Sequence, residues 1–370
     1  MSCLLAVFFF GSAMALGGNF DFQDSWVCIV IGFLLSLLLF YIYAAVIELY
    51  PGRNYYDNII QACGCGGIPG KILVLILSLY SLFTGALLLR EQAEFIHVAN
   101  LTQTPLLVVE AALTGTAVFV MRTRMNVLAR LAKFLLPILI VISGITVVLS
   151  VKDWHISHLK PFLATGFPGI AGGSLLVLSL PFGEGVVCAS MFGQLERNAK
   201  PFRVFRNGGL IAAVVILWSN MRNILILGYS NGLYAFPSYT AVSVVALGEF
   251  FTRIEVMIGI VLLFSALAKI CVFLFSCTSG LAKVFGLKDY EPLSAAGGLL
   301  FLSLAIIIVK DSQELLKFTA LIPYYSLPIQ VLVPLAALIA GKLRNGGSAK
   351  KKRGQKRAPK RKDREATRAE

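Results

Sequence analysis

Charged residues are scarce in this chain of 370 residues. Lys, Arg, Asp and Glu together make up 14% of the sequence, whereas hydrophobic residues make up 57%. Soluble domains carry about 25% charged residues, so this composition excludes an ordinary water-soluble globular protein. The sequence predicts a polytopic membrane protein.

Motifs of enzyme active sites are also missing. There is no nucleophile elbow and no HExxH helix, and the segment Gly66 to Lys71 lacks the first glycine and the Ser or Thr of a phosphate-binding loop. Cys63-Gly64-Cys65 has no partner pair or nearby histidine, and the seven cysteines imply no disulfide framework. We therefore expect no enzymatic activity, no catalytic residues, no metal and no cofactor.

Long apolar segments recur ten times along the chain. They cover 4–18, 25–49, 71–96, 105–121, 131–151, 168–192, 208–229, 249–283, 293–309 and 318–341. Most are close to the ~20 residues that a spanning helix needs. Five spans in each half place the second half upside down relative to the first. The expected fold is an all-α membrane protein with ten transmembrane helices in a 5+5 inverted repeat. It forms one transmembrane domain, 1–341, with halves 1–151 and 168–341.

Two of the predicted spans contain helix-breaking residues. The sixth span carries Pro181, Phe182, Gly183 and Glu184, and the first carries Gly11-Ser12-Ala13 followed by two further glycines. Proline removes an amide donor and glycine weakens a helix, so both spans are expected to break. Interrupted helices at corresponding places in two halves indicate a transporter-type substrate site near the bilayer midplane.

Glu184 and Lys269 are the ionisable residues placed deepest in the predicted spans. Charges at such depth are costly and usually functional, so we expect ligand binding at Glu184 and gating or ion coupling at Lys269 and Glu184. A structural ion pair is the alternative. Their estimated depths are similar, which predicts that the two side chains are coupled.

A small zwitterionic ligand fits the two breaks. Amides around Gly11, Ser12 and Ala13 are expected to hold its carboxylate at the positive end of a half-helix. Carbonyls near Pro181 to Gly183, or Glu184 itself, are expected to meet its ammonium group. Phe182 and Tyr80 complete the predicted pocket, with ordinary packing as the alternative for both.

The net charge of +14 resides mainly in the C-terminal tail. Residues 342–370 hold thirteen Lys or Arg and three Asp or Glu, which leaves +4 for the membrane body. The tail is polar and lacks aromatics, so it is predicted to be disordered and to contact anionic lipids rather than nucleic acid. Most other cations fall in loops on the same side, which the positive-inside rule makes cytoplasmic. Both termini are then cytoplasmic.

Several segments resemble the spore-germination permease family, the B subunits of germinant receptors. They are Gln23-Asp24-Ser25-Trp26, Tyr50-Pro51-Gly52, Leu89-Arg90-Glu91, Glu94-Phe95-Ile96, Pro181-Phe182-Gly183-Glu184, Gly248-Glu249-Phe250, Arg253-Ile254-Glu255, Lys269 and Phe285-Gly286-Leu287-Lys288-Asp289-Tyr290. The similarity runs from about Leu4 to Arg344. Two features depart from the family pattern: a short polar segment before the first span is lacking, and the basic tail is longer.

The resemblance implies a fold, a function and partners. The family is related to the amino acid–polyamine–organocation transporters, which implies a leucine-transporter-like fold with broken helices 1 and 6. It implies a receptor for a small nutrient, an amino acid by the chemistry above, in the cell membrane or the inner spore membrane. The implied partners are an A subunit and a lipoprotein C subunit. A proton-coupled amino acid permease and a scaffold that binds no ligand remain as alternatives.

Overall fold

The described part of the protein is helical throughout. The computed structural model describes residues 1–18, 23–64, 67–99, 102–123, 125–192, 200–244, 254–309 and 312–357, and these residues contain no β-strand. The longer elements are α1 (Ser2–Phe10), α2 (Ala13–Gly18), α3 (Ser25–Glu48), α4 (Tyr55–Ala62), α5 (Ile68–Ala99), α6 (Leu106–Arg122), α7 (Met125–Leu149), α8 (Gly166–Val177), α9 (Gly185–Ala189), α10 (Pro201–Leu227), α11 (Pro237–Val244), α12 (Ile254–Phe285), α13 (Leu293–Ile308) and α14 (Ser312–Arg357).

Each of the ten predicted spans coincides with helix. Seven of the described helical stretches are long and apolar enough to cross a membrane, and Ser2–Gly17 and Leu293–Ile308 are shorter apolar helices. The all-helical membrane fold is therefore confirmed. The count of ten crossings stays a prediction.

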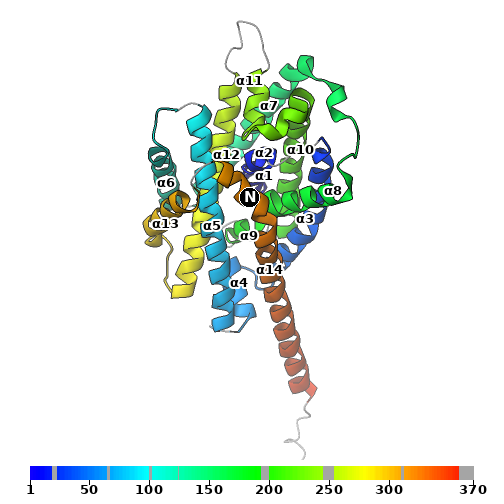
Figure 1. The fold of residues 1–370 in the computed structure, drawn as a ribbon. Helices are drawn as coiled ribbons and strands as arrows, with labels where there is room; N and C mark the ends of the chain where they lie inside the picture. The colour runs from blue at the N-terminus through cyan, green and yellow to red at the C-terminus, as the bar shows by residue number, and fades with distance from the viewer. Residues whose placement is uncertain are drawn as a thin grey trace, which may run out of the picture.

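The helices pack as two groups around one core (Figure 1). In the first group, α1 packs on α10, α10 on α3, and α3 on α8. In the second, α5 packs along α12, and α13 packs on both α5 and α6. The groups meet where α1 contacts α12 and where α14 contacts the segment after α8. Segments far apart in the sequence thus converge on the two predicted breaks.

Both breaks exist, but they differ in kind. The first span stops at Phe10 and resumes at Ala13, so Gly11 and Ser12 interrupt the helix as expected. The sixth span instead widens into a π-helical turn, η3 (Leu178–Gly183), and continues as α9 after Glu184. Pro181 lies inside this turn. A π-turn accommodates the missing amide donor without a full interruption, and such turns are common at functional sites.

The start of the second span contacts the loop that precedes α8. Asp24, directly before α3, accepts hydrogen bonds from the backbone N–H of Leu163 at 2.8 Å and of Thr165 at 3.2 Å. Gln23 donates to the carbonyl of Pro161 at 2.9 Å. The resemblance segment that begins at Gln23 therefore binds the connection between the two halves of the chain. The segments with Glu249, Arg253 and the Glu255 side chain, like Cys65, lie outside what the structure describes.

The basic tail differs from the prediction. We expected disorder from residue 342, whereas α14 continues as helix to Arg357 and projects from the bundle in Figure 1. The helix is anchored in the bundle and continues through this segment although Gly346, Gly347 and Gly354 have poor helix propensity. Residues 358–370 lie outside the described chain.

Candidate functional site

Three side chains from different elements meet at the breaks. Lys269 of α12 places Nζ 2.6 Å from Oε2 of Glu184, and the Ser12 hydroxyl donates to the same carboxylate oxygen at 3.2 Å. Lys269 also donates to the Ser12 hydroxyl. All three residues are at most 2% exposed. The structure therefore brings Glu184 and Lys269 together, as their predicted depths indicated, and adds Ser12 to the pair.

Gly11 lets α12 approach the break closely. A Cβ atom at this position would lie 3.0 Å from the carbonyl oxygen of Ser265 and 3.2 Å from Cδ of Lys269. The rings of Phe8 and Phe273 lie next to each other beside the ammonium group, with centroids 5.5 and 5.8 Å from Nζ and 5.7 Å apart. Cation–π contacts of this kind stabilise a desolvated ammonium group. The local sequence thus provides both the space and the aromatic walls for Lys269.

The amides at the first break are not free. The N–H of Gly11 donates to the carbonyl of Val7 at 3.0 Å, and the N–H of Ser12 donates to Phe9 at 3.2 Å. Ala13 starts α2, which has six residues and therefore only a weak dipole. In this conformation the N–H groups of Gly11 and Ser12 are already engaged, and their role in holding a ligand carboxylate stays a prediction. The carbonyl groups of Val7 and Phe9, in the preceding short helix, already accept hydrogen bonds from these two N–H groups.

A glutamine that the sequence reading missed fixes the π-turn. Gln330 of α14 donates from Nε2 to the hydroxyl of Tyr80 and to the carbonyl of Ser179, both at 2.8 Å. Tyr43 of α3 donates to the carbonyl of Gly183 at 3.0 Å. A Cβ atom on Gly183 would collide with the Gln330 side chain. The signal available in the sequence was a single amide side chain within an apolar span.

Tyr80 and Phe182 do not line the small cavity beside Glu184 and Lys269. The Tyr80 hydroxyl is engaged by Gln330, and Phe182 is fully buried among aromatic rings. Those rings belong to Phe9, Phe33 and Phe40, with centroid distances from 5.4 to 6.3 Å. The alternative of ordinary packing thus describes both residues in this conformation. A role in ligand binding for either stays a prediction.

A small cavity adjoins the Glu184–Lys269 pair. Its volume is about 20 Å³, and its walls come from α2, α5, η3, α12 and α14. It is lined by Ala15, Thr84, Leu87, Leu88, Glu91, Leu180, Glu184, Lys269, Leu315, Thr319 and Ile322. This space holds roughly one water-sized group. A whole amino acid requires that the surrounding helices separate.

The other predicted intramembrane charges are structural. Arg90 donates to Glu94 and to Glu110 of α6, each at 3.1 Å, and all three side chains are buried. Arg222 donates to Thr146 at 2.8 Å and to the carbonyl of Ser238 at 3.2 Å. Both arginines therefore hold neighbouring helices together. Glu91 is the exception, since it faces the cavity.

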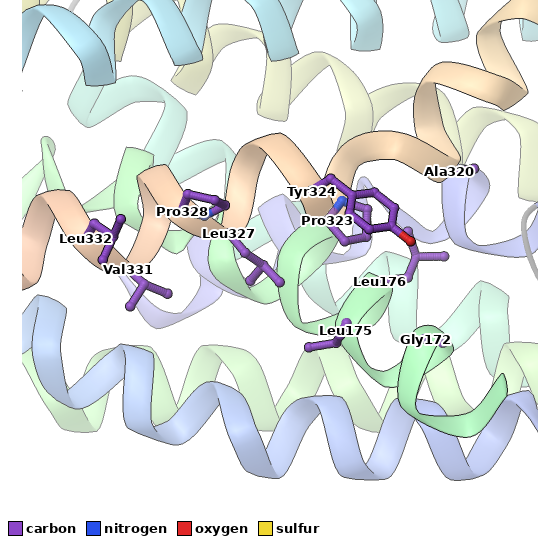
Figure 2. A pocket seen from close by; sticks show the side chains of 11 residues that line it. Gly172, Leu175, Leu176, Ala320, Pro323, Tyr324, Leu327, Pro328, Val331 and Leu332 are labelled. Atoms are coloured by element: carbon purple, nitrogen blue, oxygen red, sulfur yellow. The ribbon is translucent and has the colours of Figure 1, made fainter. Parts of the chain in front are cut away.

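A larger groove lies between α8 and α14 (Figure 2). Its volume is about 660 Å³, and its walls include Leu175, Leu176, Tyr324 and Leu327. No charged side chain lines it. A zwitterion would lose its hydration there without gaining ionic partners, which costs several kcal/mol. The small cavity with its three ionisable groups is therefore the better candidate site for a charged ligand.

The helix arrangement and the buried charges at the breaks define a membrane protein of the transporter-like fold class. A mutant manganese transporter of Eremococcus coleocola superposes with a TM-score of 0.66 at 15% identity, covering 90% of this chain and 77% of the transporter. MhsT in complex with L-phenylalanine gives a TM-score of 0.59 at 15% identity, covering 92% and 97%. Mhp1, a nucleobase-cation-symport-1 family transporter with bound bromovinylhydantoin, gives a TM-score of 0.59 at 16% identity, covering 86% of this chain and 75% of Mhp1. At these identities the likeness shows the fold alone.

The chain belongs to the spore germination protein family, also called the spore permeases, whose pattern matches residues 2–314. Spore germination protein KB of Bacillus subtilis (strain 168) is 26% identical over 346 residues, covering 91% of each chain. Spore germination protein A2 of the same organism is 24% identical over 291 residues, covering 76% of this chain and 77% of the relative. The resemblance drawn from the sequence is thereby confirmed.

Proposed function

We propose that this chain is the ligand-binding membrane subunit of a germinant receptor. It binds a small nutrient, an amino acid by the charge of the site, beside Ser12, Glu184 and Lys269, and signals to an A subunit and a lipoprotein C subunit. The observation that carries the proposal is the buried contact among these three residues at the breaks. Family membership and the transporter-like fold support it.

The contact among Ser12, Glu184 and Lys269 links ligand binding to a conformational change. Ser12 lies between α1 and α2, Glu184 follows η3, and Lys269 lies on α12, so three membrane segments share one set of charges. A ligand that competes for any of these groups alters how the segments are held together. A ligand shifts a conformational equilibrium only through such differential contacts. The receptor then passes the change to its partner subunits.

Access to the site is proposed to come through α14. Leu315, Thr319 and Ile322 cover the cavity, and Pro323 and Pro328 follow directly. Proline inside a helix removes hydrogen bonds and favours a kink. The outer turns of α14 can then move away from η3 while the rest of the helix stays packed. Opening of this kind would enlarge the cavity of about 20 Å³ to the size of a nutrient.

The proposed setting is the inner spore membrane or the cell membrane, with both termini in the cytoplasm. The cations of the C-terminal tail, 342–370, then bind anionic lipid headgroups, each well-placed cation contributing about 1 kcal/mol. The multi-pass membrane location itself follows from the apolar helices and the family.

A proton-coupled amino acid permease is the second candidate function. The observation that favours it is the presence of two carboxylates and one lysine around the same buried cavity. Two assays separate the candidates. Spores lacking this chain are tested for germination across a panel of amino acids and sugars, and uptake of labelled amino acids is measured in proteoliposomes. Loss of one nutrient response without uptake supports the receptor, whereas pH-driven uptake supports the permease.

A further inference from the structure

The charges around the small cavity do not balance. Glu91, Glu184 and Lys269 all line it, so two carboxylates face one ammonium group. Lys269 is committed to Glu184 and Ser12. The charges of both Lys269 and Glu184 act on Glu91, yet Glu91 forms no ion pair or hydrogen bond through its side chain with any residue the structure describes. A carboxylate in this position needs a proton or an external cation.

Glu91 is buried and faces the cavity. The residue is 9% exposed. The nearby charged residues on the same helix, Arg90 and Glu94, pair with one another. Thr84 lies two turns earlier on the same face of α5, and its hydroxyl lies near the hydroxyls of Tyr80 and Tyr325. A carboxylate without a partner on the wall of a buried cavity is unusual in folded proteins and indicates a ligand position.

The side chains that line the small cavity determine which kind of ligand group can bind there. Glu91 and Thr84 offer acceptor oxygens, whereas the remaining wall is mostly Leu, Ile and Ala. A bare metal cation requires about six oxygen ligands, which this wall does not supply. An ammonium group needs only a carboxylate and one or two further acceptors, and it is close to a water molecule in size. The cavity of about 20 Å³ fits such a group.

We propose that Glu91 is the subsite that binds the ammonium group of the nutrient. The inference rests on the proposed function, because it assigns one group of the ligand within the same site. It also replaces Glu184 as the expected partner of that group, since Lys269 already neutralises Glu184.

The test compares amines with their deaminated analogues. The purified full chain in nanodiscs is titrated with each standard amino acid and with its deamino analogue, such as L-alanine and propionate, and binding is read from the shift in thermal unfolding. Wild-type protein is expected to bind at least one amino acid and to discriminate against its analogue. Glu91→Gln is expected to weaken amino acid binding about ten- to hundredfold, the usual effect of losing a hydrogen bond to a charged group. Binding of the analogue should not change.

Two controls keep the test independent of folding. Removing an unpaired buried charge does not destabilise a protein, so Glu91→Gln is expected to unfold at or above the wild-type temperature. Glu94→Gln is the matched charge control on the same helix, because Glu94 pairs with Arg90 away from the cavity: it is expected to unfold at a lower temperature, since it breaks a buried ion pair, but ligand discrimination should persist in it. Glu91→Asp keeps the charge and should retain discrimination at lower affinity.

Specific outcomes would overturn the inference. These are equal binding of amino acid and analogue by wild type, unchanged amino acid binding by Glu91→Gln, or no amino acid bound at all. If spores respond through this receptor to a nutrient without an amine, and Glu91→Gln leaves that response intact, the receptor function stands and the Glu91 subsite falls. If deletion of the chain changes no germination response, the proposed function itself fails.

Discussion

Lys269 and Glu184 form an ion pair inside the membrane body, with Nζ 2.6 Å from Oε2 and both side chains at most 2% exposed. The pair connects α12 to the end of the π-turn, and both residues contact Ser12 at the break of the first span. Breaking a buried pair of this kind leaves an uncompensated charge. The pair therefore holds α12 against the π-turn and the break of the first span.

The first prediction concerns this pair. Glu184→Gln or Lys269→Met alone is expected to lower the free energy of unfolding by about 3–5 kcal/mol, because the remaining partner stays buried without a counter-charge. The double variant should recover part of the loss. Thermal unfolding of the purified proteins and germination rates of spores are measured for all three variants. Strictly additive defects would show that the two residues act independently.

The second prediction concerns the two glycines at the breaks. Gly11→Leu and Gly183→Leu are expected to abolish the nutrient response, because the new side chains would displace α12 at Gly11 and Gln330 at Gly183. Gly183→Ala is the milder test and should cost about 1–3 kcal/mol through overpacking. Combining it with Gln330→Ala should restore part of that loss. The readouts are thermal unfolding and germination.

Gly172→Ala is the matched control for the glycine series. Gly172 lies on α8, and a Cβ atom there would meet nothing within 4 Å. Its replacement should leave unfolding and germination unchanged or slightly improve stability through higher helix propensity. Normal germination by the Gly11 and Gly183 variants at unchanged receptor levels would argue against a site at the breaks.

The third prediction concerns pH and the outer loop. Burial raises the pKa of Asp24, but hydrogen bonds from Leu163, Thr165 and Ala164 outweigh burial and hold that pKa below its ordinary value. A lowered pKa gives stability that is present above the unfolded pKa and is lost as pH falls through the folded one. Docking of the loop should therefore be constant between about pH 5 and 9 and weaken only below about pH 4.

Asp24→Ala tests this docking directly. It is expected to cost about 1–3 kcal/mol at neutral pH and to reduce the loss of stability in acid. Gln23→Ala, which removes one hydrogen bond to Pro161, is the control and should keep the acid response. The measurement is the unfolding temperature as a function of pH. An acid response that survives in Asp24→Ala would assign it to another group.

The fourth prediction concerns the basic tail. Deleting residues 350–370 should leave the choice of nutrient unchanged, because residues 350–357 lie on the end of α14 that projects from the bundle (Figure 1). Binding of the protein's tail peptide to anionic vesicles should weaken as salt is raised, as expected for an electrostatic contact. Germination of spores with the truncated chain is tested on the nutrient panel. An altered nutrient preference would show that the tail acts on the site.

The sequence predicted the positions of the two helix disruptions more accurately than their kind. Gly11 and Pro181 mark the two places because glycine and proline change the backbone itself. The depth of Glu184 and Lys269 followed from counting residues along apolar spans. The choice of a π-turn at η3 over a full break depends on Gln330 and Tyr43, which come from other helices. No local pattern encodes those contacts.

Side-chain directions within the spans were the least predictable feature. α1 and α3 are apolar on every face, so their sequences carry no polar stripe that fixes which residues point inward. Phe182 therefore looked like a pocket wall and instead joins an aromatic cluster. Glu91 was given no role in the predicted pocket, yet it faces the cavity. In both cases the rotation of the helix is set by packing between helices.

The most direct measurement of the central claim is a structure of the germinant receptor with its nutrient bound. The account predicts ligand density at the cavity beside Glu91, Glu184 and Lys269, with the outer turns of α14 moved away from η3. Density in the apolar groove between α8 and α14 (Figure 2), with the cavity unchanged, would contradict it.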